Sequence, residues 1–236
     1  QPLIANTVVD KEVLAVLEQT AKQLESMGHQ VIPAEPNINI EQFWHDFIVV
    51  VCAHTAFTID NIEREFGTAH IKNLEPQTYN MALLGRSLSA VDLVHAKHGW
   101  HNSQYQTGLL LETYDMILSP TVPTPAVKHG MLPPSRMDEM MMRSAGVINK
   151  GFDMGRYAFK SGMIEKLSAP VLGKMGFTLL GNVTGLPAMS VPVGMSKKGL
   201  PIGMQLIGRM NDEATLFSLA GEMERAGLFT KPAFEK

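Results

Sequence analysis

The sequence predicts an α/β fold, because helical patterns alternate with short apolar runs that end at a proline or glycine. Apolar residues recur at helical spacing from Asp10 to Met27, and the run Gln-Val-Ile follows between His29 and Pro33. Two strand-like runs near the C-terminus are joined by a glycine-containing turn, as in a β-hairpin. With 236 residues, of which 45% are hydrophobic, the chain is long enough to bury a sizeable core.

The first predicted helix has recognisable ends. Asp10 is a suitable N-cap, because its carboxylate accepts hydrogen bonds from free backbone N–H groups of the first turn. Gly28 is a suitable stop, because glycine adopts the left-handed conformation that ends many helices. The run from His29 to Pro33 then predicts a buried strand.

Three more helices are expected before the next strand. They span Ile40 to Phe66, Pro76 to Arg86 and Ala90 to Thr113. The run from Tyr114 to Pro120 predicts a strand that the proline ends. A predicted helix is thus followed by a predicted strand twice, first between Asp10 and Pro33 and again between Ala90 and Pro120.

Regular patterns weaken between Val127 and Pro170, where methionines are concentrated. Unbranched thioether side chains adapt to varied shapes, so this stretch is a candidate cover for an apolar substrate. Loosely packed surface helices are the alternative interpretation. The methionines in question are Met131, Met137, Met140, Met141, Met142, Met154 and Met163.

The C-terminal part predicts a hairpin and a helix. Pro187 to Gly194 and Ile202 to Gly208 are the two strands, and the final helix spans Asp212 to Ala226 with Gly227 as its stop. Just upstream, Gly181 to Gly185 predicts a turn or a close approach of backbones. No lysine follows it, which argues against a phosphate-binding loop.

Composition excludes several classes of function. A net charge of −3 and an isoelectric point near 6.3, without a Lys/Arg cluster, argue against nucleic-acid binding. The most apolar stretch, Phe47 to Ala53, is far shorter than the ~20 residues of a membrane span. Cys52 is the only cysteine, so no internal disulfide forms and a reducing, cytoplasmic compartment is expected. The chain starts at Gln1 without a basic and apolar leader, so we expect a trimmed start and no signal peptide.

No complete catalytic motif is found. The patterns Gly-x-Ser-x-Gly, Ser-x-x-Lys and His-Glu-x-x-His are absent, and no cofactor motif replaces them. His95, His98 and His101 are spaced so that the outer two imidazoles diverge on a helix, which favours a solvated face over a metal site. Cys52 and His54 point to different sides of a helix, which favours an inert, buried cysteine over a thiol nucleophile.

Four segments nevertheless carry a recognisable pattern. They are FTLLGNVTGLPAMSVPVG at Phe177 to Gly194, GLPIGMQLIG at Gly199 to Gly208, YDMILSPT at Tyr114 to Thr121, and the passage through Gly28-His29 between Leu24 and Val31. This ordered combination resembles the C-terminal part of amidase signature enzymes. Within that family it is most similar to bacterial amidases of the 6-aminohexanoate cyclic dimer hydrolase type. The resemblance covers most of the chain and weakens between Lys128 and Pro170.

The resemblance implies a fold and an activity. Residues 1–236 would form the C-terminal portion of a single amidase domain, with part of a mixed β-sheet flanked by helices on both faces. The full-length enzyme would hydrolyse linear or cyclic amides through a serine acyl-enzyme, using a serine, a second serine held by a cis peptide, and a lysine. Those residues belong to the family's N-terminal half, which has no match here. We therefore assign no catalytic residue and expect this chain alone to be inactive.

Four residues are candidates for substrate binding. Ligands of open α/β sheets bind beyond the carboxyl ends of strands, which suggests Ser119, Thr121 and the loop of Asn182. A turn hydrogen bond is the structural alternative for Asn182. Cys52 is added as a residue that lines the pocket from the long helix.

The expected partners follow from this assignment. They are a small-molecule amide and the N-terminal half of the same protein, with no cofactor, metal, nucleic acid or membrane. An exposed sheet edge also predicts self-association of the isolated chain. Two alternatives remain: the amide-hydrolysing subunit of a tRNA-dependent amidotransferase, and a catalytically silent binding domain with the same fold.

Overall fold

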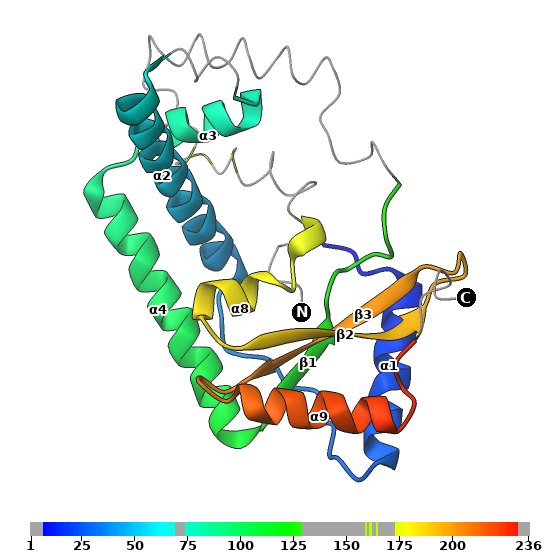
Figure 1. Cartoon of the computed structure of the whole chain (residues 1–236). Coiled ribbons are helices and arrows are strands. Elements are labelled where there is room, and N and C mark those ends of the chain that lie inside the picture. The colour runs from blue at the N-terminus through cyan, green and yellow to red at the C-terminus, as the bar shows by residue number, and fades with distance from the viewer. Residues whose placement is uncertain are drawn as a thin grey trace. The chain divides into compact units, whose positions relative to one another are not determined.

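Two structural units make up the described part of the chain, which comprises residues 7–68, 74–128, 159, 161, 164 and 173–230 of a computed structural model (Figure 1). The first unit draws its described residues from segments 1–40, 101–128 and 169–236, and the second from segments 41–100 and 129–168. The methionine-rich stretch that the sequence suggests as a substrate cover falls almost wholly outside the described residues.

The first unit contains a three-stranded sheet of β1 (Met116–Pro120), β2 (Ala188–Met195) and β3 (Pro201–Gly208). The order is β1-β3-β2, and both pairings are antiparallel. The α/β class is therefore confirmed, although pairing within the described residues is antiparallel where a mixed sheet was expected. β3 is the last of these three strands in the chain but the central one in the sheet, with β1 and β2 on either side. Because β1 and β2 are each antiparallel to β3, they run in the same direction.

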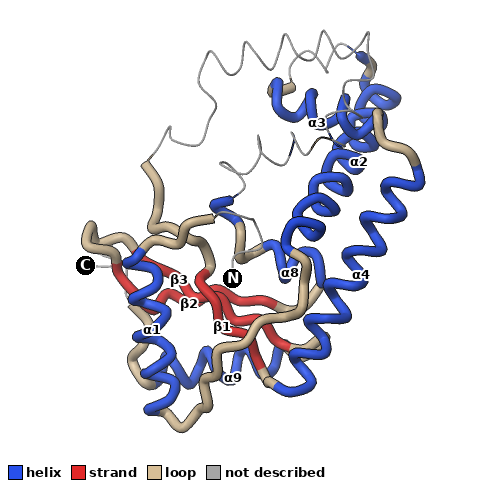
Figure 2. The backbone as a smooth tube through the Cα atoms, turned by 180° about the vertical axis from the view of Figure 1, so that it is seen from behind, coloured by secondary structure: helices blue, strands red, loops and turns tan. Residues whose placement is uncertain are grey.

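One face of this sheet packs against α1 (Lys11–Ser26) and α9 (Glu213–Arg225) (Figures 1 and 2). Side chains alternate along a strand, so every second residue of β3 points into this layer. The resulting core removes a large apolar area from water, which is the main driving force for folding of this unit. Its buried members are Val13, Val16, Leu24, Val191, Val193, Ile202, Met204, Leu206, Leu216, Ala220 and Met223.

The opposite face of the sheet contacts the short helix α8 (Leu179–Thr184), which follows the 3-10 turn η2 (Gly173–Met175) (Figure 1). A Cβ atom added at Gly181 would lie 3.2 Å from the Cβ of Ala188, so α8 and β2 approach closely at this glycine. The expectation of helices on both faces of the sheet is met within this unit.

The ends of α1 and α9 follow the sequence signals. Asp10 accepts a 2.7 Å hydrogen bond from Glu12 N–H, and Asp212 accepts one of 3.3 Å from Thr215 N–H. Gly28 and Gly227, which follow the two helices, have φ of 100° and 76°, values that other residues adopt only under strain.

The strand predicted between His29 and Pro33 is not formed. His29 N–H still bonds to Leu24 O as part of the helix end, and none of the described strands pairs with this segment. Val31 packs against the core, but Ile32 is 53% exposed. The segment is therefore a loop, and Val31 is the apolar residue of the run that attaches it to the core.

The second unit consists of α2 (Ile40–Phe66), α3 (Pro76–Arg86) and the first part of α4 (Ala90–Thr113), whose remainder belongs to the first unit. These three helices have the bounds expected from the sequence. Gly85 of α3 lies directly against the backbone carbonyl of Cys52 in α2, where a Cβ atom would collide with it. The two helices therefore pack at backbone distance.

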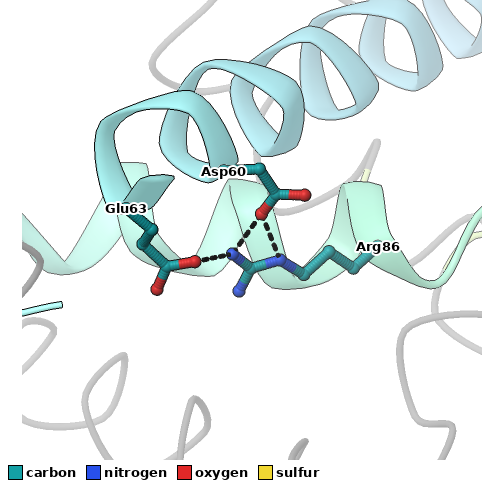
Figure 3. A network of polar contacts seen from close by, with 3 residues as sticks. All are labelled: Asp60, Glu63 and Arg86. Atoms are coloured by element: carbon teal, nitrogen blue, oxygen red, sulfur yellow. Dashed lines mark hydrogen bonds and ion pairs between the residues drawn. The ribbon is translucent and has the colours of Figure 1, made fainter. Parts of the chain in front are cut away.

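A charged network joins the exposed ends of α2 and α3 (Figure 3). Arg86 donates to Asp60 Oδ1 through Nε at 3.1 Å and Nη2 at 2.5 Å, and to Glu63 Oε2 at 3.0 Å. The hydrogen bond to Asp60 is the main reason that the pKa of Arg86 lies above the ordinary value of an arginine. Arg86 therefore holds two acidic side chains of a neighbouring helix at once.

Candidate functional site

A row of polar side chains crosses the first unit's sheet on the face opposite the α1/α9 core. Ser119 of β1 and Ser190 of β2 both pair with Gln205 of β3. Directly paired residues point to the same face of a sheet. The antiparallel register thus brings together three polar residues that lie far apart in the sequence.

Gln205 has a structural partner in this row. It is only 4% exposed, and its Nε2 donates a 3.2 Å hydrogen bond to the backbone carbonyl of Phe177. A buried amide without a partner is costly, so this bond fixes the segment that leads into α8. Gln205 thereby has a structural role: it links β3 to the segment before α8.

Thr121 and Ser190 meet above the central strand. Their hydroxyl oxygens lie 2.6 Å apart, and Thr121 N–H extends the ladder by donating to Gly203 O at 3.1 Å. A Cβ atom at Gly203 would lie 2.8 Å from Ser190 Oγ and 3.1 Å from Thr121 Oγ1. The hydroxyl pair exists because Gly203 leaves room for it.

Ser119 lies within β1, one pleat before Thr121, and is half-buried. Its hydroxyl donates a 3.2 Å hydrogen bond to the carbonyl of the next residue, Pro120. Thr121 follows the carboxyl end of β1, whereas Ser119 lies inside the strand. Ser119 instead belongs to the polar row.

Asn182 lies on the exposed side of α8, in a helix where the sequence predicted a turn. Residues 179–184 form a helical segment that ends at Gly185, whose φ is 69° and whose N–H bonds to Gly181 O at 2.9 Å. Within the described residues the Asn182 side chain makes no hydrogen bond, so the turn bond considered for it is not formed. Its amide faces solvent.

Cys52 lies in the second unit, on the buried side of α2, and is 2% exposed. His54 is exposed on the same helix, so the two side chains point to different sides as predicted. Its burial fits the prediction of an inert cysteine.

A buried carboxylate is the main electrostatic feature of the second unit. Asp46 of α2 is 3% exposed and accepts a 2.8 Å hydrogen bond from Gln42 Nε2, and its other oxygen lies against Gly99 of α4. Burial raises the pKa of Asp46, and the Gln42 bond and nearby His45 and His95 oppose this in part. No sequence pattern pointed to this residue.

The second unit also contains an apolar cavity of about 560 Å³. Among the described residues, the lining includes no Asp, Glu, Lys or Arg side chain. The ring of Trp100 stacks on Phe47 with a centroid distance of 6.4 Å, and Phe47 stacks on Trp44 at 5.5 Å. The lining residues are Val50, Val51, His54, Thr55, Thr58, Ile59, Ile62, Leu74, Thr78 and Trp100.

Neither a metal-binding cluster nor a helix suited to crossing a membrane is found among the described residues. Within these, no group of three or more His, Cys, Asp or Glu side chains is placed to hold a metal ion. In the same part of the chain, every helix is too short or too polar to cross a membrane.

Sequence reasoning missed Ser190 and Gly203. Both lie in the segments that carry the family resemblance, but their roles depend on the register between β2 and β3. The hairpin prediction contained the needed signal, because pairing of its strands brings Ser190 beside Gln205.

Several solved structures share this fold. The structure of 6-aminohexanoate cyclic dimer hydrolase matches 100% of this chain and 46% of that chain, with a TM-score of 0.75 and 23% identity. A glutamyl-tRNA(Gln) amidotransferase subunit from Thermotoga maritima matches 95% of this chain and 42% of that chain, with a TM-score of 0.56 and 23% identity. At these identities the similarity establishes the fold alone.

Sequence comparison identifies the family. Residues 4–150 and 158–217 match the protein family described as Amidase, and the chain therefore belongs to the amidase signature family. It is 27% identical over 214 residues to putative amidase AmiA2 of Mycobacterium tuberculosis, and 28% identical over 246 residues to a glutamyl-tRNA(Gln) amidotransferase subunit of Lactococcus lactis. These matches cover 90% and 94% of this chain but only 37% and 43% of the relatives. The chain thus spans less than half the length of these relatives.

Proposed function

We propose that the full-length protein is an amidase that cleaves linear or cyclic amide bonds through a serine acyl-enzyme. Residues 1–236 would be the C-terminal portion of its single amidase domain. The observation that carries this proposal is the family match over residues 4–150 and 158–217. A nucleophile and its base are required for this chemistry, and we expect the Ser-cisSer-Lys triad in the N-terminal half of the family's pattern.

The proposed role of this chain is to form part of the substrate pocket. Ser119 would contact the polar part of the substrate from the polar row of the sheet, and Thr121 from the hydroxyl pair that it forms with Ser190. Asn182 would contribute from α8, where its amide is exposed. Cys52 stays a proposed substrate-binding residue of the second unit, where it would act as a small apolar group of α2.

Turnover by the full-length protein tests this function. Purified full-length protein should release carboxylate and amine from linear amides and from a cyclic amide, whereas residues 1–236 alone should show no burst from an activated ester. Failure of the full-length protein to hydrolyse any of these amides would overturn the proposal. A burst from residues 1–236 that a serine-directed inhibitor abolishes would overturn the assignment of catalysis to the other half.

A second candidate is the amide-hydrolysing subunit of a tRNA-dependent amidotransferase. The supporting observation is 45% identity over 76 residues to a glutamyl-tRNA(Gln) amidotransferase subunit of Rhodospirillum rubrum, a match that covers 31% of this chain. Such a protein would purify with partner subunits and release ammonia from glutamine. A full-length protein that purifies without partner subunits and releases no ammonia from glutamine would argue against this candidate.

The remaining alternative is a catalytically silent binding domain. It is favoured if the coding sequence upstream of Gln1 lacks a lysine followed by a Gly/Ser-rich segment with two suitably placed serines. A cytoplasmic location and self-association of the isolated chain complete the proposal. The location rests on the single cysteine, and the self-association on the outer edge of β1, which none of the described strands covers.

A further inference from the structure

We propose that the hydroxyl pair of Thr121 and Ser190 binds the edge of a primary carboxamide or lactam group, and that Gly203 keeps this place open. The proposal rests on the proposed function, since it assigns a substrate-binding role within the same site. It also adds Ser190 and Gly203, which the sequence did not suggest.

The hydrogen-bonding capacity of the pair specifies its ligand. Each hydroxyl has one donor hydrogen and two acceptor lone pairs. Because one hydroxyl donates to the other across 2.6 Å, the second keeps its hydrogen for an outside partner, and the first keeps its lone pairs. The pair therefore presents a donor and an acceptor side by side.

A primary carboxamide presents the matching pattern, because its carbonyl oxygen and one N–H point to the same edge. A lactam has the same arrangement, since its ring holds the amide cis. A linear N-alkyl amide is trans, so its C=O and N–H point to opposite sides and only one of them reaches the pair. A carboxylate offers acceptors only and satisfies half of the pattern.

The surroundings leave the pair accessible. Ser190 is exposed and Thr121 is half-buried. Gln205, the amide in the polar row, is only 4% exposed and is bonded through Nε2 to the Phe177 carbonyl. Gly203 offers no side chain between the two hydroxyls, and a Cβ atom there would lie 2.8 Å from Ser190 Oγ.

Binding is tested on the 236-residue chain by saturation-transfer NMR, which does not depend on hydrolysis. Butyramide and 2-pyrrolidinone are the probes, with N-methylbutyramide and butyrate as matched controls. Both probes should bind more tightly than both controls, and S190A and T121V should weaken probe binding by about three- to tenfold, the value of one hydrogen bond. G203A should weaken it similarly. S218A, which removes an exposed hydroxyl on α9, should leave binding unchanged.

The outcomes separate the two ligand sources and the two proposals. Binding of butyramide but not 2-pyrrolidinone assigns the site to carboxamides, and the reverse assigns it to lactams. Equal signals for probes and controls, or binding that S190A and T121V leave unchanged while both variants keep the wild-type melting temperature, would overturn the inference. Loss of amide hydrolysis in the full-length protein with intact probe binding would instead count against the proposed function alone.

Discussion

The hydroxyl oxygens of Thr121 and Ser190 lie 2.6 Å apart although their strands are not neighbours in the sheet. Strands separated by one other strand are about 10 Å apart, so two short side chains meet only if the residue between them is small. Gly203 occupies that position, and its missing side chain creates the contact.

Replacing Gly203 by alanine should destabilise the first unit. The new Cβ would lie 2.8 Å from Ser190 Oγ, and relief requires movement of that side chain and loss of its bond to Thr121. We expect a cost of about 0.5–1.5 kcal/mol in the free energy of unfolding, the value of one hydrogen bond, measured by chemical denaturation. The double variant G203A/S190A should recover part of this loss. A purely additive cycle would mean that the contact does not cause the effect.

Two glycines of α4 should respond to alanine in opposite ways. A Cβ at Gly99 would collide with the Asp46 carboxylate, so G99A should lower the free energy of unfolding by about 1–3 kcal/mol or more. A Cβ at Gly108 meets no atom within 4 Å, so G108A should raise it by up to about 1 kcal/mol through helix propensity. Equal effects in thermal denaturation would show that Asp46 and Gly99 are not in contact.

Asp46 should make stability depend on pH. Its pKa is raised in the folded protein, mainly by burial, so folding favours the protonated carboxyl. The stabilising contribution is present below the unfolded value of 3.8 and is lost as pH rises through the folded pKa. D46N cannot ionise, so its free energy of unfolding should improve relative to wild type as pH rises across this window. Parallel pH profiles of the two proteins would contradict the assignment.

Arg86 should contribute modestly and in a salt-dependent way. R86M removes the contacts to Asp60 and Glu63, which are partly exposed, so the loss should not exceed about 1 kcal/mol. The difference should shrink in about 1 M salt, where the screening length falls to about 3 Å. K22M is a suitable control, since this exposed cation of α1 has no ion pair within the described residues. A loss that is unchanged by salt would indicate packing of the arginine stem instead.

Local signals predicted the helices well and the long-range contacts poorly. The bounds of α2, α3 and α4 and the caps of α1 and α9 depend on residues close in the sequence, so patterns and end residues were sufficient. The apolar run between His29 and Pro33 failed as a strand, because a strand also needs a partner, which no local pattern specifies. The contact between Thr121 and Ser190 joins residues 69 positions apart and depends on two separate registers.

The strand order β1-β3-β2 also bears on how the first unit folds. β2 and β3 are joined by the short segment 196–200, so their hairpin is a local structure that needs little loop-closure entropy. β1 reaches β3 only after a long stretch of chain has been closed into a loop, and contacts of this kind slow folding. The hairpin is therefore expected to form first and β1 to dock onto it later. Contact between Thr121 and Ser190 would then be a marker for the last step of sheet assembly.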